Sequence, residues 1–169
     1  MLRRRDLVVL GGMSAAGLGL LGRLVFGGPR PLCADDVVCQ ERQAQRDLPH
    51  SADPIWAVLK RCRVSLDKQS GDYSLMPTSE VKGMVGRRVR VGGFVVPLDG
   101  SDRTRKFLIG VNTPVCFYHP PGDPNEVIAV DAATPVEWTD RPVMLEGMFT
   151  LIDNAQAGVF FKLTDAREV

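Results

Sequence analysis

The stretch Val89-Arg90-Val91-Gly92-Gly93-Phe94-Val95-Val96-Pro97 decides the fold. Apolar residues alternate with others up to Gly93, as in a strand with one buried face, and Pro97 ends the run because proline cannot continue a central strand. The same order recurs in Val143-Met144-Leu145-Glu146-Gly147-Met148. A glycine inside a strand often marks a bend, and a bent strand can serve both sides of a small barrel. The two stretches therefore predict two bent strands.

Further short apolar runs also read as strands and are mostly bounded by Gly, Pro, Asn or Asp. They are residues 106–111, 115–118, 126–130 and 159–163. Many short strands separated by turn residues are typical of a barrel or sandwich. We therefore predict a mainly β chain, with a small five- or six-stranded barrel resembling the oligonucleotide/oligosaccharide-binding fold. That name describes a shape and implies no ligand.

One helix is expected before the barrel. Asp53-Pro54 precedes the apolar residues of 55–59, so that Asp53 can cap the helix and Pro54 can occupy its first turn. Trp56 and Leu59 then face the main body and fill part of the core. The predicted architecture is a barrel with one added N-terminal helix.

The first 34 residues resemble an export signal of the twin-arginine type. Arg4-Arg5-Asp6-Leu7-Val8 is followed by a glycine-diluted apolar run, and Cys33-Ala34 offers a small-residue end for cleavage. Arg23 interrupts the run before it reaches the roughly 20 apolar residues of a spanning helix. We therefore predict recognition by the export machinery, cleavage after Ala34 and a periplasmic location. The domains are residues 1–34 as signal, 35–52 as a polar arm that is flexible or weakly helical, and 53–169 as a single barrel-like domain.

Charge and cysteine content limit the classes of function. The chain has 21 Lys and Arg against 20 Asp and Glu, so it offers no polybasic face, and nucleic acid is not expected as a partner. Cleavage after Ala34 would leave Cys39, Cys62 and Cys116, of which only two can pair within the chain. A Cys39–Cys62 disulfide and two unpaired thiols both remain open.

The segment Pro114–Glu126 has the highest density of reactive side chains. Cys116 and His119 are three residues apart at a proline-rich turn, and thiolate and imidazole are the ligands that zinc and copper(I) prefer. Two ligands do not complete a site. The other candidates are His50, Asp99, Asp102, Asp123 and Glu126. The pattern predicts a metal site, with zinc as the metal.

Two other interpretations of this pair stay open. Cys116 can be a buried thiol beside a histidine that only bonds to backbone. It can also be a nucleophile with His119 as its base, although no oxyanion-hole motif and no residue to orient the imidazole accompanies the pair. Catalysis is therefore less favoured than metal binding.

The chain resembles a bacterial family of exported proteins catalogued as a domain of unknown function. The resemblance spans residues 53–165 and rests on five groups of residues: Trp56 with Leu59, Gly93–Leu98, Phe107–Ile109, Cys116-x-x-His119-x-Pro121, and Pro124-Asn125. Family members usually have a longer proline run and a Gln after the Asn, where this chain has Gly122-Asp123 and Glu126. The resemblance implies a periplasmic protein, and some relatives accompany metal-transport systems.

Together these features favour a non-enzymatic periplasmic protein that binds or handles metal through Cys116 and His119. It would act as an accessory to a transport system, with a membrane transporter or another envelope protein as its partner. The alternative is a structural or protein-interaction module of an envelope complex, in which the same two residues only brace a turn.

Overall fold

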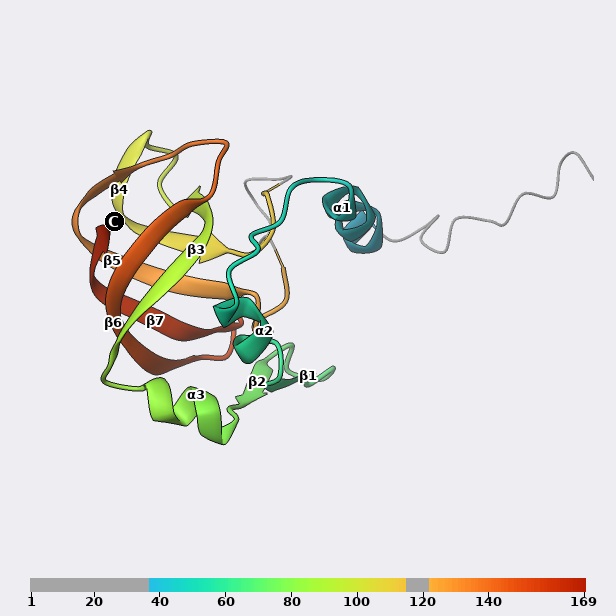
Figure 1. Ribbon diagram of the computed structural model, residues 1–169. Helices are drawn as coiled ribbons and strands as arrows, with labels where there is room; N and C mark the ends of the chain where they lie inside the picture. The colour runs from blue at the N-terminus through green and yellow to red at the C-terminus, as the bar shows by residue number, and fades with distance from the viewer. Residues whose placement is uncertain (1–36, 115–121) are drawn as a thin grey trace, which may run out of the picture. The chain divides into compact units, whose positions relative to one another are not determined.

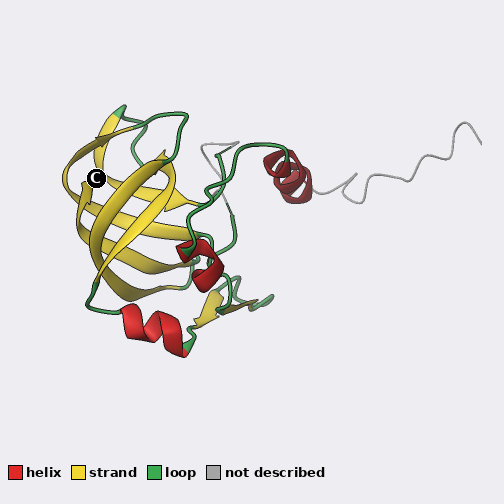
Figure 2. Ribbon diagram, viewed as in Figure 1, coloured by secondary structure: helices red, strands yellow, loops and turns green. Residues whose placement is uncertain are grey.

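Five strands close into a barrel (Figures 1 and 2). They are β3 (Arg88–Pro97), β4 (Arg103–Gly110), β5 (Val127–Glu137), β6 (Val143–Asn154) and β7 (Val159–Glu168). Their order around the barrel is β3-β4-β5-β7-β6, and only the β5–β7 pair is parallel. The computed structural model describes residues 37–114 and 122–169. The prediction of a mainly β chain with a small barrel of this type is confirmed, with five strands.

The predicted bend in β3 lies at its paired glycines. Residues Arg88–Gly93 pair with β6, whereas Phe94–Pro97 pair with β4, so the strand changes neighbour after Gly93. A Cβ atom at Gly93 would lie 2.6 Å from the carbonyl oxygen of Gly110 and 2.8 Å from Cγ1 of Ile109. Any larger residue would push β3 and β4 apart, so this position requires glycine.

The second predicted bend lies in β6. Its register with β7 shifts between Glu146 and Met148, and a Cβ atom at Gly147 would be 3.1 Å from the Cα atom of Ala166. In β7 the neighbouring Asp165 adopts a φ of 49°, in the left-handed region that few non-glycine residues use. The Arg88 guanidinium, which donates to the Asp165 carboxylate, and nearby Arg167 lower the pKa of Asp165. β6 and β7 therefore bend together near Arg88, at the start of β3.

The barrel interior is packed with large apolar side chains. Phe149 and Phe161 face each other at 5.8 Å between ring centroids, with a tilt of 31°. Other fully buried side chains are Phe107, Leu59, Ile109, Ile128, Leu145, Leu163, Val81, Val91 and Val95. Leu59 and Val81 come from helices outside the barrel, so the helices extend the barrel's core.

Among the described residues, three helices and a small two-stranded sheet accompany the barrel. The helices are α1 (Val37–Arg46), α2 (Ile55–Leu59) and α3 (Ser79–Met84), and the sheet pairs β1 (Arg63–Leu66) with β2 (Tyr73–Met76). The predicted helix corresponds to α2, and its first turn is capped as expected because the Asp53 carboxylate accepts from the Ile55 amide at 2.9 Å. The polar segment before it, expected to be flexible or weakly helical, contains α1. No helix among the described residues is long and apolar enough to cross a membrane.

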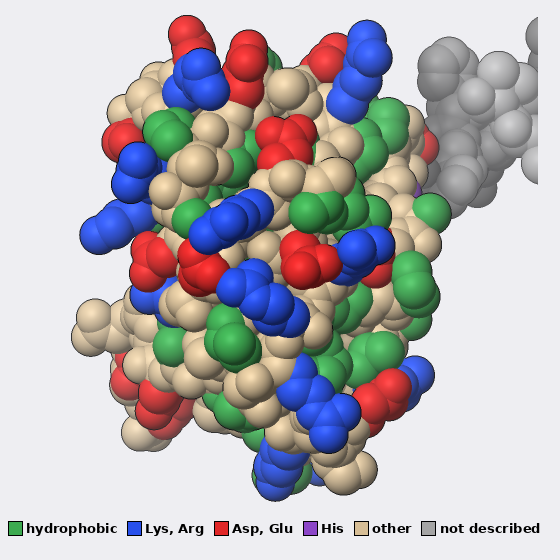
Figure 3. All heavy atoms as spheres, turned by 60° about the vertical axis from the view of Figure 1, so that its left-hand side comes forward, with side chains coloured by type: hydrophobic (Ala, Val, Ile, Leu, Met, Phe, Trp, Pro, Cys, Tyr) green, Lys and Arg blue, Asp and Glu red, His purple; other side chains and the backbone are tan. Residues whose placement is uncertain are grey.

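Charges of both signs are mixed on the outside of the molecule (Figure 3). Several ion pairs join different strands of the barrel. These are Arg88–Asp165, Arg90–Glu146 at 2.9 Å and Lys162–Asp131 at 2.5 Å. Exposed pairs of this kind stabilise a fold by less than about 1 kcal/mol each, so the barrel depends on its core and its glycine bends instead.

Gly93→Ala should lower the free energy of unfolding by about 1–3 kcal/mol, because its methyl group would overlap backbone that cannot move without opening the sheet. Gly83→Ala is the matched control, since no atom lies within 4 Å of the added Cβ and alanine suits helix α3 better. Urea unfolding followed by circular dichroism measures both. A Gly93→Ala protein as stable as the wild type would contradict this account of the bend.

Candidate functional site

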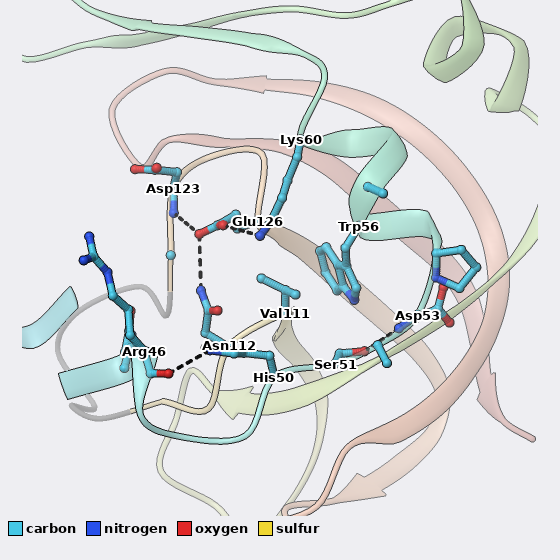
Figure 4. A pocket seen from close by; sticks show the side chains of 15 residues that line it. Arg46, His50, Ser51, Asp53, Trp56, Lys60, Val111, Asn112, Asp123 and Glu126 are labelled. Carbon is cyan, nitrogen blue, oxygen red and sulfur yellow. Dashed lines mark hydrogen bonds and ion pairs between the residues drawn. The ribbon is translucent and has the colours of Figure 1, made fainter. Parts of the chain in front are cut away.

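A pocket of about 580 Å³ opens beside α2, where the end of β4 and the start of β5 meet the segment that joins α1 to α2 (Figure 4). Its polar and charged lining comes from separate parts of the chain: Arg46, His50, Asp53, Lys60, Asn112, Asp123 and Glu126. Asn112 and Gly122, which line the pocket, come shortly before and directly after residues 115–121 in the sequence, the segment that carries Cys116 and His119.

One wall of the pocket is a short pairing between distant segments. His50 forms an isolated antiparallel bridge with Asn112. On either side of it, the Ser51 amide donates to the Val111 carbonyl oxygen at 2.8 Å, and the Thr113 hydroxyl donates to the Pro49 carbonyl oxygen at 2.7 Å. The chain entering α2 is thereby fixed along the chain leaving β4.

The same entering chain also holds the β3 bend. The indole N–H of Trp56 donates to the carbonyl oxygen of Gly92 at 2.7 Å, and the Ser51 hydroxyl donates to the same oxygen. The Gly92 amide in turn donates to the Asp53 carboxylate at 2.8 Å. Trp56 is almost completely buried, so its N–H requires this acceptor. These contacts form the Gly92 clamp, made by Ser51, Asp53 and Trp56.

Glu126 is the central carboxylate of the pocket (Figure 4). One of its oxygens accepts from the Asn112 side-chain amide at 3.2 Å and from the Asp123 backbone amide at 3.1 Å. The other lies 2.7 Å from Nζ of Lys60, the residue that follows α2. A Cβ atom at Gly122 would lie only 2.4 Å from the first oxygen, so glycine gives this carboxylate its room. Glu126 therefore joins both ends of the β4–β5 connection to α2.

His50 is the described imidazole of the pocket, and it is exposed. Its Nε2 atom lies 3.4 Å from the carbonyl oxygen of Arg46, which is long for a hydrogen bond. A neutral imidazole with an available lone pair is the form that binds metal.

The structure divides the predicted ligand set. Cys116 and His119, the two predicted metal ligands, lie outside the described residues. His50, Asp123 and Glu126 line the pocket. The other two carboxylates lie in the β3–β4 turn, at the opposite end of β4, roughly 23 Å away for an eight-residue strand. There Asp99 accepts from the Ser101 hydroxyl and amide, and these bonds lower its pKa.

The cysteines are paired differently from either expectation. Cys39 is disulfide-bonded, whereas Cys62 is a free thiol with 3% of its surface exposed. A Cys39–Cys62 disulfide and a pair of unpaired thiols are therefore both wrong. The physical reason lies in Cys62, which comes three residues after α2 and packs in the main core, where it behaves as a small apolar side chain.

The described residues do not form a complete metal site by themselves. Within residues 37–114 and 122–169, no three His, Cys, Asp or Glu side chains are grouped so that they could hold a metal ion. The donors of the pocket are nevertheless of the right chemistry, since imidazole and carboxylate both bind zinc. A site here needs further ligands from residues 115–121.

Asn125 has a role that sequence reasoning missed. Its side-chain amide donates to the Lys60 carbonyl oxygen at 3.3 Å and to the Cys62 carbonyl oxygen at 3.1 Å, which satisfies acceptors at the end of α2. Pro124 beside it is buried. The Pro124-Asn125 signature was visible in the sequence, but its partners are more than 60 residues away, so no local pattern could reveal them.

Most of the described chain falls within a match to one protein family. Residues 35–161 match a family model described as "Protein of unknown function (DUF3299)". The chain belongs to this family. The match includes the clamp, the pocket and the segment that carries Cys116 and His119. No curated protein and no solved structure matches the chain significantly.

Asn125→Asp should destabilise the protein by about 1–3 kcal/mol, because the carboxylate cannot donate to the carbonyl oxygens that it would face. Asn154→Asp is the control. The Asn154 side chain only accepts, from the Ala157 amide, and aspartate keeps that acceptor. Thermal and urea unfolding of both variants should separate them. Equal stabilities would mean that the two donated bonds contribute nothing.

Proposed function

We propose that this protein is a non-enzymatic metal-binding or metal-handling protein of the periplasm, with zinc as its metal. Cys116 and His119 are the proposed ligands, and His50 with Asp123 or Glu126 would complete the set. The protein would serve as an accessory to a membrane transporter or another envelope protein.

One observation carries the proposal: three of the five additional candidate ligands converge at the two ends of the Cys116–His119 segment. His50 is brought there by its bridge to Asn112, and Glu126 by its bonds across the pocket. These residues are far apart in the sequence, so their meeting is a property of the fold. An imidazole and carboxylates beside a thiol and a second imidazole match the ligand types of zinc.

Zinc binding to the mature protein tests the proposal. After reduction and removal of metal, the wild type should bind one zinc per chain in competition with a chromogenic chelator. His119→Ala and His50→Ala should each weaken binding by roughly tenfold or more, since each removes a donor. Asp99→Asn is the control, because Asp99 lies in the distant β3–β4 turn and should not change the affinity. A wild-type protein without stoichiometric zinc would remove the proposal.

The alternative function is a structural or protein-interaction module of an envelope complex. Exposed apolar side chains favour it at the other end of the barrel: Leu98 is 59% and Trp138 47% exposed. They belong to neighbouring turns, because the Trp138 amide donates to the Asp102 carbonyl oxygen at 2.8 Å. If zinc does not bind, this module remains as the proposal.

Export through the twin-arginine pathway can be tested separately. Replacing both Arg4 and Arg5 by lysine should leave the uncleaved precursor in the cytoplasm, because that pathway's receptor reads the arginine pair. Cell fractionation and intact mass measure the result, and an Arg30→Lys precursor is the control. Mature protein in the periplasm of cells that carry the paired substitution would contradict this signal type.

A further inference from the structure

The outer edge of the β1–β2 hairpin has no strand partner among the described residues. There β1 pairs with β2 alone, and β2 lies on the barrel side, where the Tyr73 amide donates to the Ala155 carbonyl oxygen at 2.9 Å (Figure 1). The side chains of Arg63, Ser65 and Leu66 are exposed. An exposed strand edge is a template for pairing with another chain. The edge of β1 is therefore a candidate interface.

The hydrogen bonds of the hairpin determine which backbone groups face this edge. The Asp67 amide donates to the Asp72 carbonyl oxygen at 2.9 Å, so the backbone groups of Asp67 point toward the β2 side. Backbone groups alternate in direction along an antiparallel strand. Those of Arg63 and Ser65 therefore point toward β2 as well. Those of Val64 and Leu66 point outward, so the open edge offers two donors and two acceptors.

The sequence of this edge is complementary to its own reverse. It reads Arg63-Val64-Ser65-Leu66-Asp67. If two copies pair antiparallel about Ser65, Val64 lies opposite the partner's Leu66, and these outward-facing residues exchange four hydrogen bonds. At both ends of the pairing, Arg63 lies opposite the partner's Asp67. Opposite charges and apolar pairs that face each other across strands are both stabilising.

The two charges are suited to a partner chain. Within one chain, Arg63 and Asp67 are four positions apart on an extended segment, roughly 13 Å, which is too far for an ion pair. The Asp67 carboxylate accepts from the Gln69 amide at 2.8 Å through Oδ1, which leaves Oδ2 for a guanidinium. A register shifted by two residues would place Ser65 or Gln69 opposite Arg63 and lose both ion pairs. Charge therefore selects the pairing centred on Ser65.

We propose that the protein forms a symmetric dimer through β1, with a second copy of the same chain on its open edge. The two hairpins then form one four-stranded sheet in the order β2-β1-β1-β2. Such an interface uses the same surface of both copies, so assembly ends at two. Five residues of each copy make a small interface, so we expect a weak dimer that depends on protein concentration. The proposal is independent of metal binding.

A disulfide across the two-fold axis tests the register. Ser65 would face its own copy in a non-hydrogen-bonded pair with Cα atoms about 4.5 Å apart, within disulfide range. Ser65→Cys should therefore give a covalently linked dimer on mild oxidation of the mature protein, measured by non-reducing electrophoresis.

Ser74→Cys is the matched control. The Ser65 and Ser74 hydroxyls contact each other at 2.7 Å, so both replacements remove the same bond. The two copies of Ser74 would be three strand spacings apart, about 14 Å, and should not link. Absence of a linked dimer from Ser65→Cys, or equal linkage in both variants, would overturn the proposal.

Charge reversal tests the ion pairs. Arg63→Asp and Asp67→Arg each place like charges opposite each other at both ends of the pairing, so each should weaken the dimer by about tenfold in sedimentation equilibrium. An equal mixture of the two variants restores opposite charges at both ends and should dimerise like the wild type. Lys68→Asp is the control, because Lys68 lies outside the paired residues, and it should dimerise normally. A mixture no better than its components would contradict this register.

Discussion

The barrel closes only because β3 leaves β6 and joins β4 within one residue, and the Gly92 clamp holds the backbone where this change occurs. Both backbone polar groups of Gly92 have partners at this bend. Its carbonyl oxygen accepts from Trp56 and Ser51, and its amide donates to the Asp53 carboxylate. A buried peptide group without partners costs about 1–3 kcal/mol. The bend is therefore stabilised by the segment that precedes the barrel in the sequence, which makes that segment part of the barrel's structure.

The clamp also determines where the pocket lies. Ser51 bonds to Gly92 through its hydroxyl and to Val111 through its amide, so one residue fixes both the β3 bend and the end of β4. His50 is adjacent to Ser51 and consequently lies beside Asn112. On the other side, two residues attach the start of β5 to the end of α2. Asn125 donates to the carbonyl oxygens of Lys60 and Cys62, and Glu126 pairs with the Lys60 ammonium group. The β4–β5 connection is thus fixed at both ends by the same helical segment.

The parts of this architecture that were predictable from the sequence are those with a local cause. The bends at Gly93 and Gly147 were predictable because each needs a glycine at a single position, where an added Cβ atom would find no room. The alternation of apolar residues predicted the strands around them. The β1–β2 sheet was not predicted, since its residues are mostly polar or exposed and its pairing contributes little to the core. The pocket could not be predicted as a whole. Its bridge joins His50 to Asn112 across 62 positions, and no spacing rule connects them. Cys116 and His119 were identified by their local spacing. The described structure adds the residues that lie at the two ends of the segment that carries them.

The charge balance of the pocket constrains how it could accept a cation. Glu126 already has Lys60 at 2.7 Å, and both groups are only partly buried, so this pair contributes little stability and its partners can separate at low cost. A divalent ion placed near Glu126 would repel Lys60 and compete for the same oxygen. Because Lys60 is 45% exposed, its flexible side chain can turn toward water while Asn112 and the Asp123 amide keep the other carboxylate oxygen in place. The carboxylate would then stay oriented by neutral donors, with its second oxygen available to a cation. The ion pair is therefore compatible with metal binding, and without a cation Lys60 neutralises the charge of Glu126.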